Sequence, residues 1–137
     1  MSNQVPTGSA GIKVLVIDDS NTIRRSAEIF LKQGGYDVLL AEDGFDALAK
    51  VNDHDPDLIF CDILMPRLDG YQTCAIIKRN VKFSDVPVIM LSSKDGLFDK
   101  ARGRMVGSQD YLTKPFTKDQ LLLAVEQHSR TGRTHAV

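Results

Sequence analysis

Short apolar runs alternate along the chain with segments whose apolar residues are spaced as on one face of a helix. The runs are too short, and on average too rich in β-branched residues, to favour helix, so they predict strands. The predicted strands are 12–17, 37–40, 58–61, 88–91 and 111–112. An amphipathic segment follows each of them, which predicts five helices.

The predicted helices carry local signals as well as spacing. The first starts from Asn21, with Ser20 or Asn21 as its N-cap and the Gly34–Gly35 pair as its stop signal. The fourth spans 97–106 and contains Gly103. The apolar faces of the second, third and fifth helices are formed by Ala47, Leu48 and Val51, by Cys74 and Ile77, and by Leu121, Ala124, Val125 and His128.

Strands that alternate with helices usually pair in parallel, because a right-handed crossover through a helix joins them. The runs "KVLVI", "DLIF" and "PVIML" are apolar without alternation, as expected for strands covered on both faces. The predicted class is therefore α/β, with a doubly wound, five-stranded parallel sheet. The 137 residues fit one domain. We expect it at 12–128, between a flexible amino-terminal segment at 1–11 and a flexible tail at 129–137.

Charge and composition exclude some classes of function. With 17 basic and 18 acidic residues, the net charge of -1 gives no reason to expect nucleic acid as a partner. No run approaches the roughly 20 apolar residues of a membrane span, and the first residues do not resemble a signal peptide. We therefore expect a cytoplasmic protein. Cys61 and Cys74 lie in apolar segments and are expected to be buried free thiols.

Polar residues follow four of the five predicted strands. They are Asp18 and Asp19 after the first, Asp62 after the third, Ser92 and Ser93 after the fourth, and Lys114 and Pro115 after the fifth. A lone Asp in such a place is more often a turn residue or a helix cap. Ligands of open α/β sheets, however, bind outside the carboxyl ends of the strands, so the joint placement predicts a functional site there. The sequence leaves the Lys114–Pro115 bond open between cis and trans.

The chemistry of this set points to a metal ion and a phosphoryl group. Crowded carboxylates repel one another unless a cation intervenes, and Mg²⁺ prefers oxygen ligands that include carboxylates and phosphates. Lys114 would neutralise a phosphoryl group and Ser92 would donate a hydrogen bond to it. Asp62 is the candidate nucleophile, because its strand is predicted between the acidic pair and the Ser92–Lys114 pair.

Four segments of the chain resemble, in order and spacing, the signature segments of bacterial two-component receiver domains: "VLVIDDSNTIRR", "DLIFCDILMPRLDGY", "PVIMLSS" and "DYLTKPF". The resemblance implies a flavodoxin-like fold with strand order 2-1-3-4-5. It also implies that Asp62 is the phosphoacceptor and Tyr111 an aromatic switch residue, while Ser92 and Lys114 contact the phosphoryl group. For Mg²⁺ it implies Asp19 as a direct ligand, Asp18 as a ligand through water, and the backbone carbonyl of Leu64 as a further ligand.

The segments "DGFDALAK", "PRLDGYQTCAIIK" and "SSKDGLFDKARGRMVGS" resemble the response regulators of type IV pilus twitching motility. This likeness implies a phosphodonor that is a chemotaxis-like histidine kinase and a downstream partner in the pilus machinery or its regulators. The family implies a signalling protein, expected as a monomer, whose enzymatic activity is confined to its own phosphorylation and slow dephosphorylation. Leu64 and Lys94 occupy positions that tune dephosphorylation in the family.

Signalling requires an element with two states. We expect Ser92 to move toward the phosphoryl group and Tyr111 to rotate inward. The helix at 97–106 is the candidate soft element, because Gly103 costs it about 1 kcal/mol relative to Ala. The output surface is expected on helix 4, strand 5 and helix 5, with Phe98, Met105 and Tyr111 at its border.

Two alternatives can be weighed against this hypothesis. A Mg²⁺-dependent phosphohydrolase of the haloacid dehalogenase type needs a second Asp two positions after the first, where this chain has Ser20. A calcium loop starting at Asp53 would need Gly at the place of Leu58 and Glu at the place of Leu64. His54, His128 and His135 are too scattered in sequence to predict a metal site.

Overall fold

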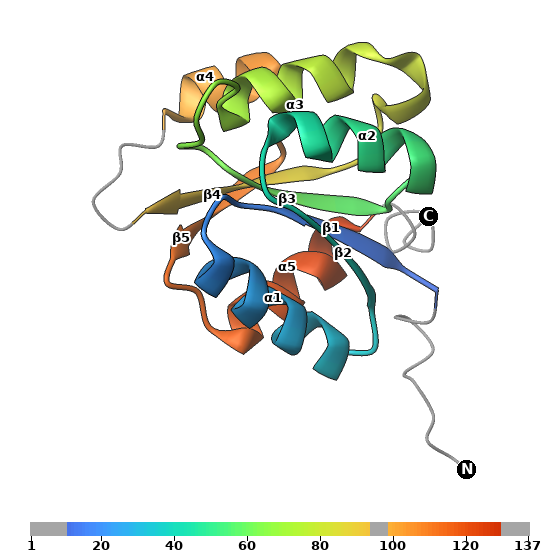
Figure 1. Ribbon diagram of the computed structural model, residues 1–137, viewed down its shortest axis with the longest axis vertical. Helices are drawn as coiled ribbons and strands as arrows, with labels where there is room; N and C mark the ends of the chain where they lie inside the picture. The colour runs from blue at the N-terminus through green and yellow to red at the C-terminus, as the bar shows by residue number, and fades with distance from the viewer. Residues whose placement is uncertain (1–10, 94–98, 130–137) are drawn as a thin grey trace.

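Five parallel strands form one sheet in the order β2-β1-β3-β4-β5, and the predicted fold class and strand order are confirmed. The computed structural model describes residues 11–93 and 99–129. The strands are β1 (Lys13–Ile17), β2 (Asp37–Ala41), β3 (Leu58–Asp62), β4 (Val88–Ser93) and β5 (Asp110–Lys114). Their carboxyl ends all lie at the left edge of the sheet in Figure 1.

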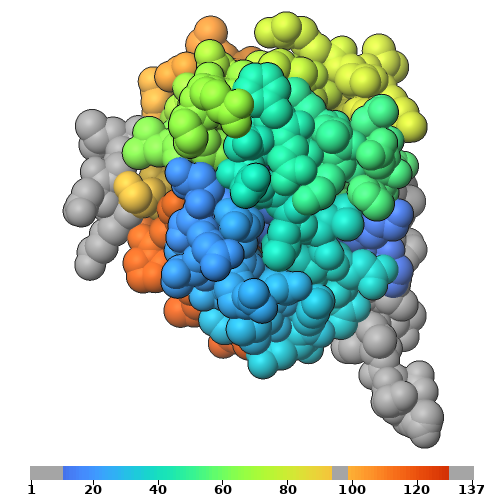
Figure 2. All heavy atoms as spheres, in the orientation of Figure 1, coloured from blue at the N-terminus to red at the C-terminus, as the bar shows by residue number. Residues whose placement is uncertain are grey.

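Helices cover both faces of the sheet. They are α1 (Asn21–Gln33), α2 (Gly44–His54), α3 (Gly70–Arg79), α4 (Lys100–Val106) and α5 (Lys118–His128), with the short 3₁₀ helix η2 (Val81–Phe83) after α3. α2, α3 and α4 lie above the sheet in Figure 1, and α1 and α5 lie below it. Figure 2 shows the same side, where the surface is formed largely by α1 (blue), α2 (teal) and α3 (yellow-green).

Alternation along the central strands divides the core between the two faces. Leu15 and Ile17 of β1 belong to the cluster under α2 and α3, whereas Val14 and Val16 belong to the cluster against α1 and α5. β3 and β4 divide in the same way, and all these side chains are fully buried. The unbroken apolar runs of the sequence are therefore strands buried on two sides. Cys61 and Cys74 are buried free thiols, as predicted.

Capping residues fix the helix ends. The Ser20 hydroxyl accepts a hydrogen bond from the Ile23 N–H, so Ser20 is the N-cap of α1, and α1 ends at Gly34. The predicted start of the fourth helix at 97 is wrong, because Asp99 is the N-cap and α4 begins at Lys100. Phe98 and the predicted first residue of this helix lie outside the described residues.

The start of α3 packs directly on the end of β3. A capping box between Asp69 and Gln72 begins this helix. A Cβ atom on Gly70 would lie 2.2 Å from the carbonyl oxygen of Asp62, so this position requires glycine. The Gly70 N–H also donates to the Ile63 carbonyl. The position of α3 is thus tied to the backbone of Asp62.

None of the helices in the described ranges is both long and apolar enough to cross a membrane. The expected flexible segments at 1–11 and 129–137 lie almost wholly outside these ranges, and Lys94 lies outside them too. The domain limits at 12 and 128 therefore stay a prediction.

Candidate functional site

Three carboxylates meet at the carboxyl edge of the sheet. Asp18, Asp19 and Asp62 each offer an oxygen within 4.8 Å of the others. Asp18 and Asp62 are buried, whereas Asp19 is exposed. Successive residues of a strand point to opposite faces, so two neighbouring carboxylates reach one site only because β1 ends at Ile17. The predicted convergence of the strand ends is present in the structure.

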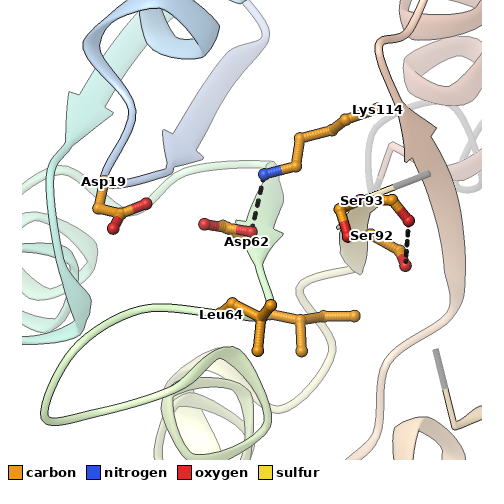
Figure 3. A pocket seen from close by; sticks show the side chains of 7 residues that line it. Asp19, Asp62, Leu64, Ser92, Ser93 and Lys114 are labelled. Carbon is orange, nitrogen blue, oxygen red and sulfur yellow. Dashed lines mark hydrogen bonds and ion pairs between the residues drawn. The ribbon is translucent and has the colours of Figure 1, made fainter. Parts of the chain in front are cut away.

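Lys114 crosses from β5 into this cluster. Its Nζ donates to Asp62 Oδ1 at 2.9 Å and to Asp18 Oδ2 at 3.1 Å, and Figure 3 shows the Lys114–Asp62 bond from close by. Three carboxylates and one ammonium leave two formal negative charges without compensation. The cluster therefore has a charge and a set of hard oxygen donors that suit a divalent cation such as Mg²⁺.

Burial and neighbouring charge shift the protonation of this cluster. Burial raises the pKa of the Asp62 carboxyl to about 6; the Lys114 ammonium opposes this shift, and the Asp18 carboxylate adds to it. Burial alone would lower the pKa of Lys114, but the hydrogen bond to Asp62 and the two carboxylate charges raise it overall. Lys114 is thus held in its charged form, and burial disfavours the charged form of Asp62.

The two neighbouring aspartates have different environments. Asp18 Oδ1 accepts a hydrogen bond from the Ser20 N–H at 2.8 Å, and its Oδ2 accepts from Lys114. The Asp18 carbonyl accepts from the Arg24 guanidinium. Asp19 instead lines the pocket from the solvent side. Asp18 is therefore committed to protein contacts, and Asp19 is open to a ligand.

A pocket of about 180 Å³ opens over the carboxylates, lined by Asp19, Asp62, Ile63, Leu64, Ser92, Ser93 and Lys114. Ser92 is buried and its hydroxyl donates to the Ser93 carbonyl at 3.3 Å (Figure 3). The strand register places Leu91, just before Ser92, opposite Asp62. The pocket thus gathers a carboxylate, a hydroxyl and an ammonium from three adjacent strands, which suits a tetrahedral anion beside a cation.

The predicted switch residue lies on β5, three residues before Lys114, and does not line the pocket. Tyr111 is half-buried against the core on the side of α3, and the Lys100 ammonium lies 5.6 Å from its ring centre. Met105 on α4 is exposed, and Gly103 is buried. The Lys114–Pro115 bond, which the sequence left open, is cis.

Other candidate metal sites do not assemble in the described part of the chain, where the three aspartates form the one group of three potential ligands. Asp57 of the calcium-loop alternative accepts a hydrogen bond from the Lys13 N–H, and Asp55 ends α2. His128 pairs with Asp110, and His135 lies outside the described residues. The loop predicted from Asp53 is shorter than expected: residues 55–57 lead into β3, whereas Asp53 and His54 are the last residues of α2.

Two neighbours of the site were missed at the sequence level. Ser93 lines the pocket, although only Ser92 was assigned a role, and Arg24 supports the backbone of Asp18. Arg24 lies six residues after Asp18, at the start of α1, and no sequence motif distinguishes it from the adjacent Arg25.

Comparison with known proteins identifies the family. The family described as response regulator receiver domain matches residues 14–126. This chain belongs to the response regulator receiver family. The receiver is 68% identical over 120 residues to Protein PilG of Pseudomonas aeruginosa. The aligned region covers 88% of this chain and 89% of PilG.

Solved structures agree with this assignment. Chemotaxis protein CheY4 of Vibrio cholerae is 33% identical, with a TM-score of 0.82 over 87% of this receiver and 99% of that chain. The receiver domain of the Francisella response regulator 1452 is 37% identical, with a TM-score of 0.79 over 90% and 99%. The predicted family is confirmed, and the phosphohydrolase alternative has no support: the residue where it needs a second Asp is the N-cap Ser20.

Proposed function

We propose that this receiver accepts a phosphoryl group on Asp62 from a histidine kinase and signals through a change of conformation. The observation that carries the proposal is the buried Asp62 carboxylate, held 2.9 Å from the Lys114 ammonium at the floor of an open pocket. The Asp62 oxygen attacks the phosphorus of a phosphohistidine, an acyl phosphate forms and the N–P bond breaks, and the leaving imidazole takes a proton from water. Slow attack of water on the phosphorus then breaks the bond between the Asp62 oxygen and phosphorus, releases inorganic phosphate and restores the carboxylate.

Asp19, Asp62 and the backbone carbonyl of Leu64 are the proposed direct ligands of Mg²⁺, with Asp18 acting through water. The exposure of Asp19 and the protein contacts of both Asp18 oxygens support this division. When bound, Mg²⁺ supplies positive charge to the phosphoryl oxygens. Lys114 supplies a second positive charge, and the Ser92 hydroxyl can donate to a phosphoryl oxygen once it leaves the Ser93 carbonyl.

The proposed switch links Asp62 to the surface formed by α4, β5 and α5. A phosphoryl group adds about -1.5 to -2 charges at pH 7, and Lys114 and Ser92 are the groups that would respond to it. Movement of Ser92 would open space toward which Tyr111 rotates. Tyr111 and the exposed Met105 then change what this surface offers a partner.

The switch predicts a local change in α4. We expect the amides of Lys100–Val106 to exchange hydrogen at a rate at least about threefold different when beryllofluoride and Mg²⁺ occupy the site, because α4 is short and contains Gly103. Hydrogen exchange with mass spectrometry measures this. The α1 amides are the internal control, and Asp62→Asn, which cannot hold the mimic, is the matched variant. Equal exchange in both states would exclude α4 as the switch.

The proposed biological role is control of type IV pilus twitching motility in the cytoplasm. It is supported by the likeness to the response regulators of twitching motility and by the 68% identity to PilG. The proposed phosphodonor is a chemotaxis-like histidine kinase, and the proposed output partner belongs to the pilus machinery or its regulators.

A phosphotransfer profile tests the function. The purified receiver is mixed with each phosphorylated histidine kinase of the source organism, with Mg²⁺ and with EDTA. We expect rapid, Mg²⁺-dependent labelling from one chemotaxis-like kinase and transfer at least about tenfold slower from the others. Labelling by none of them would overturn the proposed signalling role, and preference for a kinase of another type would overturn the assignment to pilus control.

A further inference from the structure

The loop between β3 and α3 contains a tight turn at Arg67. The Leu68 N–H donates to the Pro66 carbonyl at 2.7 Å, two residues back, and Arg67 has φ 69°. A three-residue turn with a left-handed central residue is rare, and it is strained for a residue with a side chain. Leu64, which lines the pocket, lies three residues before Arg67. A contact that holds Arg67 therefore also restrains the wall of the pocket.

Two contacts hold the Arg67 side chain against the β2–α2 loop and the first turn of α2. Its guanidinium lies 2.9 Å from Asp43 Oδ2 and 5.1 Å from the centre of the Phe45 ring. The Asp43 side chain is 18% exposed, and its other oxygen caps α2 by accepting from the Asp46 N–H. The Arg67 side chain is 65% exposed, so the ion pair alone contributes little, but Asp43 is held in place by its role as N-cap and the Phe45 ring adds a second contact.

The same part of the chain also supports the acidic pair. The carbonyl of Ala41, the last residue of β2, accepts from the Asp18 N–H at 3.1 Å. Gly44 packs so closely on the β3–α3 loop that a Cβ atom would lie 2.8 Å from Leu68 Cδ2. The segment 41–45, which runs from the last residue of β2 to the first turn of α2, is therefore in contact with the backbone beside Asp19 and with the segment that follows Leu64.

We propose that Arg67 is a positioning residue: through Asp43 and Phe45 it ties the β3–α3 loop to the β2–α2 loop and thereby sets the distance between the two walls of the cation site. The effect on Mg²⁺ binding rests on the proposed function. The contact of Arg67 with Asp43 and Phe45, called the Arg67 tie below, is a property of the metal-free protein. Arg67 touches neither the pocket nor the reacting groups, and it acts through the backbone of 64–68.

Substitutions on both sides of the tie test it. Removing a residue that supports metal ligands typically weakens metal binding about 10–100-fold. Because the Arg67 tie is partly exposed, we expect its removal to weaken Mg²⁺ binding by less than that. We expect Arg67→Gln to raise the Mg²⁺ dissociation constant about 3–10-fold, measured by calorimetric titration. Asp43→Asn should have a similar effect, because it removes the carboxylate partner of Arg67 while Asn still caps α2. Arg67→Lys should have a smaller effect, because it keeps the charge but loses the contact of the planar guanidinium with the Phe45 ring.

Two further variants separate positioning from stability. Arg67→Gly relieves the left-handed conformation, so we expect an unchanged or higher melting temperature together with weaker Mg²⁺ binding. Lys32→Gln is the matched control, because it removes an ion pair of 3.0 Å with Glu28 on α1, away from the pocket. The double variant of Arg67→Gln and Asp43→Asn should bind Mg²⁺ about as weakly as either single variant.

Amide exchange in the metal-free protein gives the second measurement. The Leu68 amide should exchange at least about threefold faster in Arg67→Gln and in Asp43→Asn than in the wild type or in Lys32→Gln. Unchanged exchange and unchanged Mg²⁺ affinity would overturn the tie, as would equal weakening in Lys32→Gln. A wild-type protein that binds no Mg²⁺ would overturn the proposed metal site, whereas faster Leu68 exchange in the variants would still support the tie.

Discussion

Replacing Asp62 with Asn is expected to abolish phosphoryl labelling of the receiver while leaving its fold intact. Asn has the size and shape of Asp but cannot form an acyl phosphate, so labelling should fall at least about 1000-fold. Intact-protein mass spectrometry after incubation with Mg²⁺ and a small phosphodonor, such as acetyl phosphate, measures the added phosphoryl group. Full labelling of Asp62→Asn would move the acceptor to another residue.

The same variant should be more stable than the wild type without Mg²⁺. The pKa of Asp62 is raised to about 6, so its charged form is disfavoured in the folded protein. Asn imitates the neutral form, and we expect it to stabilise the metal-free receiver at pH 7 by about 1–2 kcal/mol, less than the full shift implies because the pocket is open to solvent. Urea denaturation in EDTA, at matched pH, measures the difference.

The difference in stability between the wild type and Asp62→Asn should depend on pH with a definite sign. Between the ordinary pKa of an Asp, about 3.9, and a folded-state pKa of about 6, the folded wild type binds a proton that the unfolded chain does not bind. Its stability relative to Asp62→Asn therefore rises as the pH falls from 7 toward 4. A difference that is constant over this range would show that Asp62 is not the titrating group.

Central strands were predictable from the sequence because burial on both faces produces unbroken apolar runs. β1, β3 and β4 lie within two residues of their predicted limits. β5 was predicted as two residues and has five, because in this edge strand the exposed polar residues Asp110 and Thr113 stand on either side of half-buried Tyr111 and Leu112. The last residue of β5, Lys114, is polar and lines the pocket, so hydrophobicity could not mark the end of this strand.

The residues that meet at the site were predictable from the sequence, but the different environments of Asp18 and Asp19 were not. Polar residues at strand ends mark the edge where ligands bind, and this rule identified the residues at the ends of four strands. Whether Asp18 or Asp19 is committed to protein contacts depends on the Ser20 N–H and on Lys114, which is 96 residues from Asp18 in sequence. The Arg67 tie was missed for the same reason, because it joins two loops 24 residues apart.

Removing Lys114 is expected to have the opposite effect on stability to removing the Asp62 charge. Asp18 is fully buried and the Asp62 side chain is 5% exposed, and both give an oxygen to the Lys114 ammonium. Breaking a buried charge network on one side leaves carboxylates without compensation, which typically costs 3–5 kcal/mol. We expect Lys114→Gln to lose about 3 kcal/mol of metal-free stability at pH 7, measured by urea denaturation.

Two measurements distinguish the loss of the Lys114 charge from a loss of packing: the response to Mg²⁺ and the stability of a second lysine variant. Saturating Mg²⁺ binds the crowded carboxylates of the folded state, so it should restore more stability to Lys114→Gln than to the wild type. Lys50→Gln removes the partly exposed pair with Asp46 and should cost less than about 1 kcal/mol. A similar loss in both variants would contradict the role of buried charge.

Lys114→Gln also separates phosphorylation from its consequence. Asp62 remains available as the nucleophile, so labelling should be reduced but measurable when Mg²⁺ is present. The phosphoryl group, however, lacks the ammonium that connects it to β5, the strand that carries Tyr111. We therefore expect α4 exchange in the labelled variant to match that of the unlabelled one. A normal α4 response would mean that the signal leaves Asp62 through β4 or through the start of α3, where Gly70 packs on the Asp62 backbone.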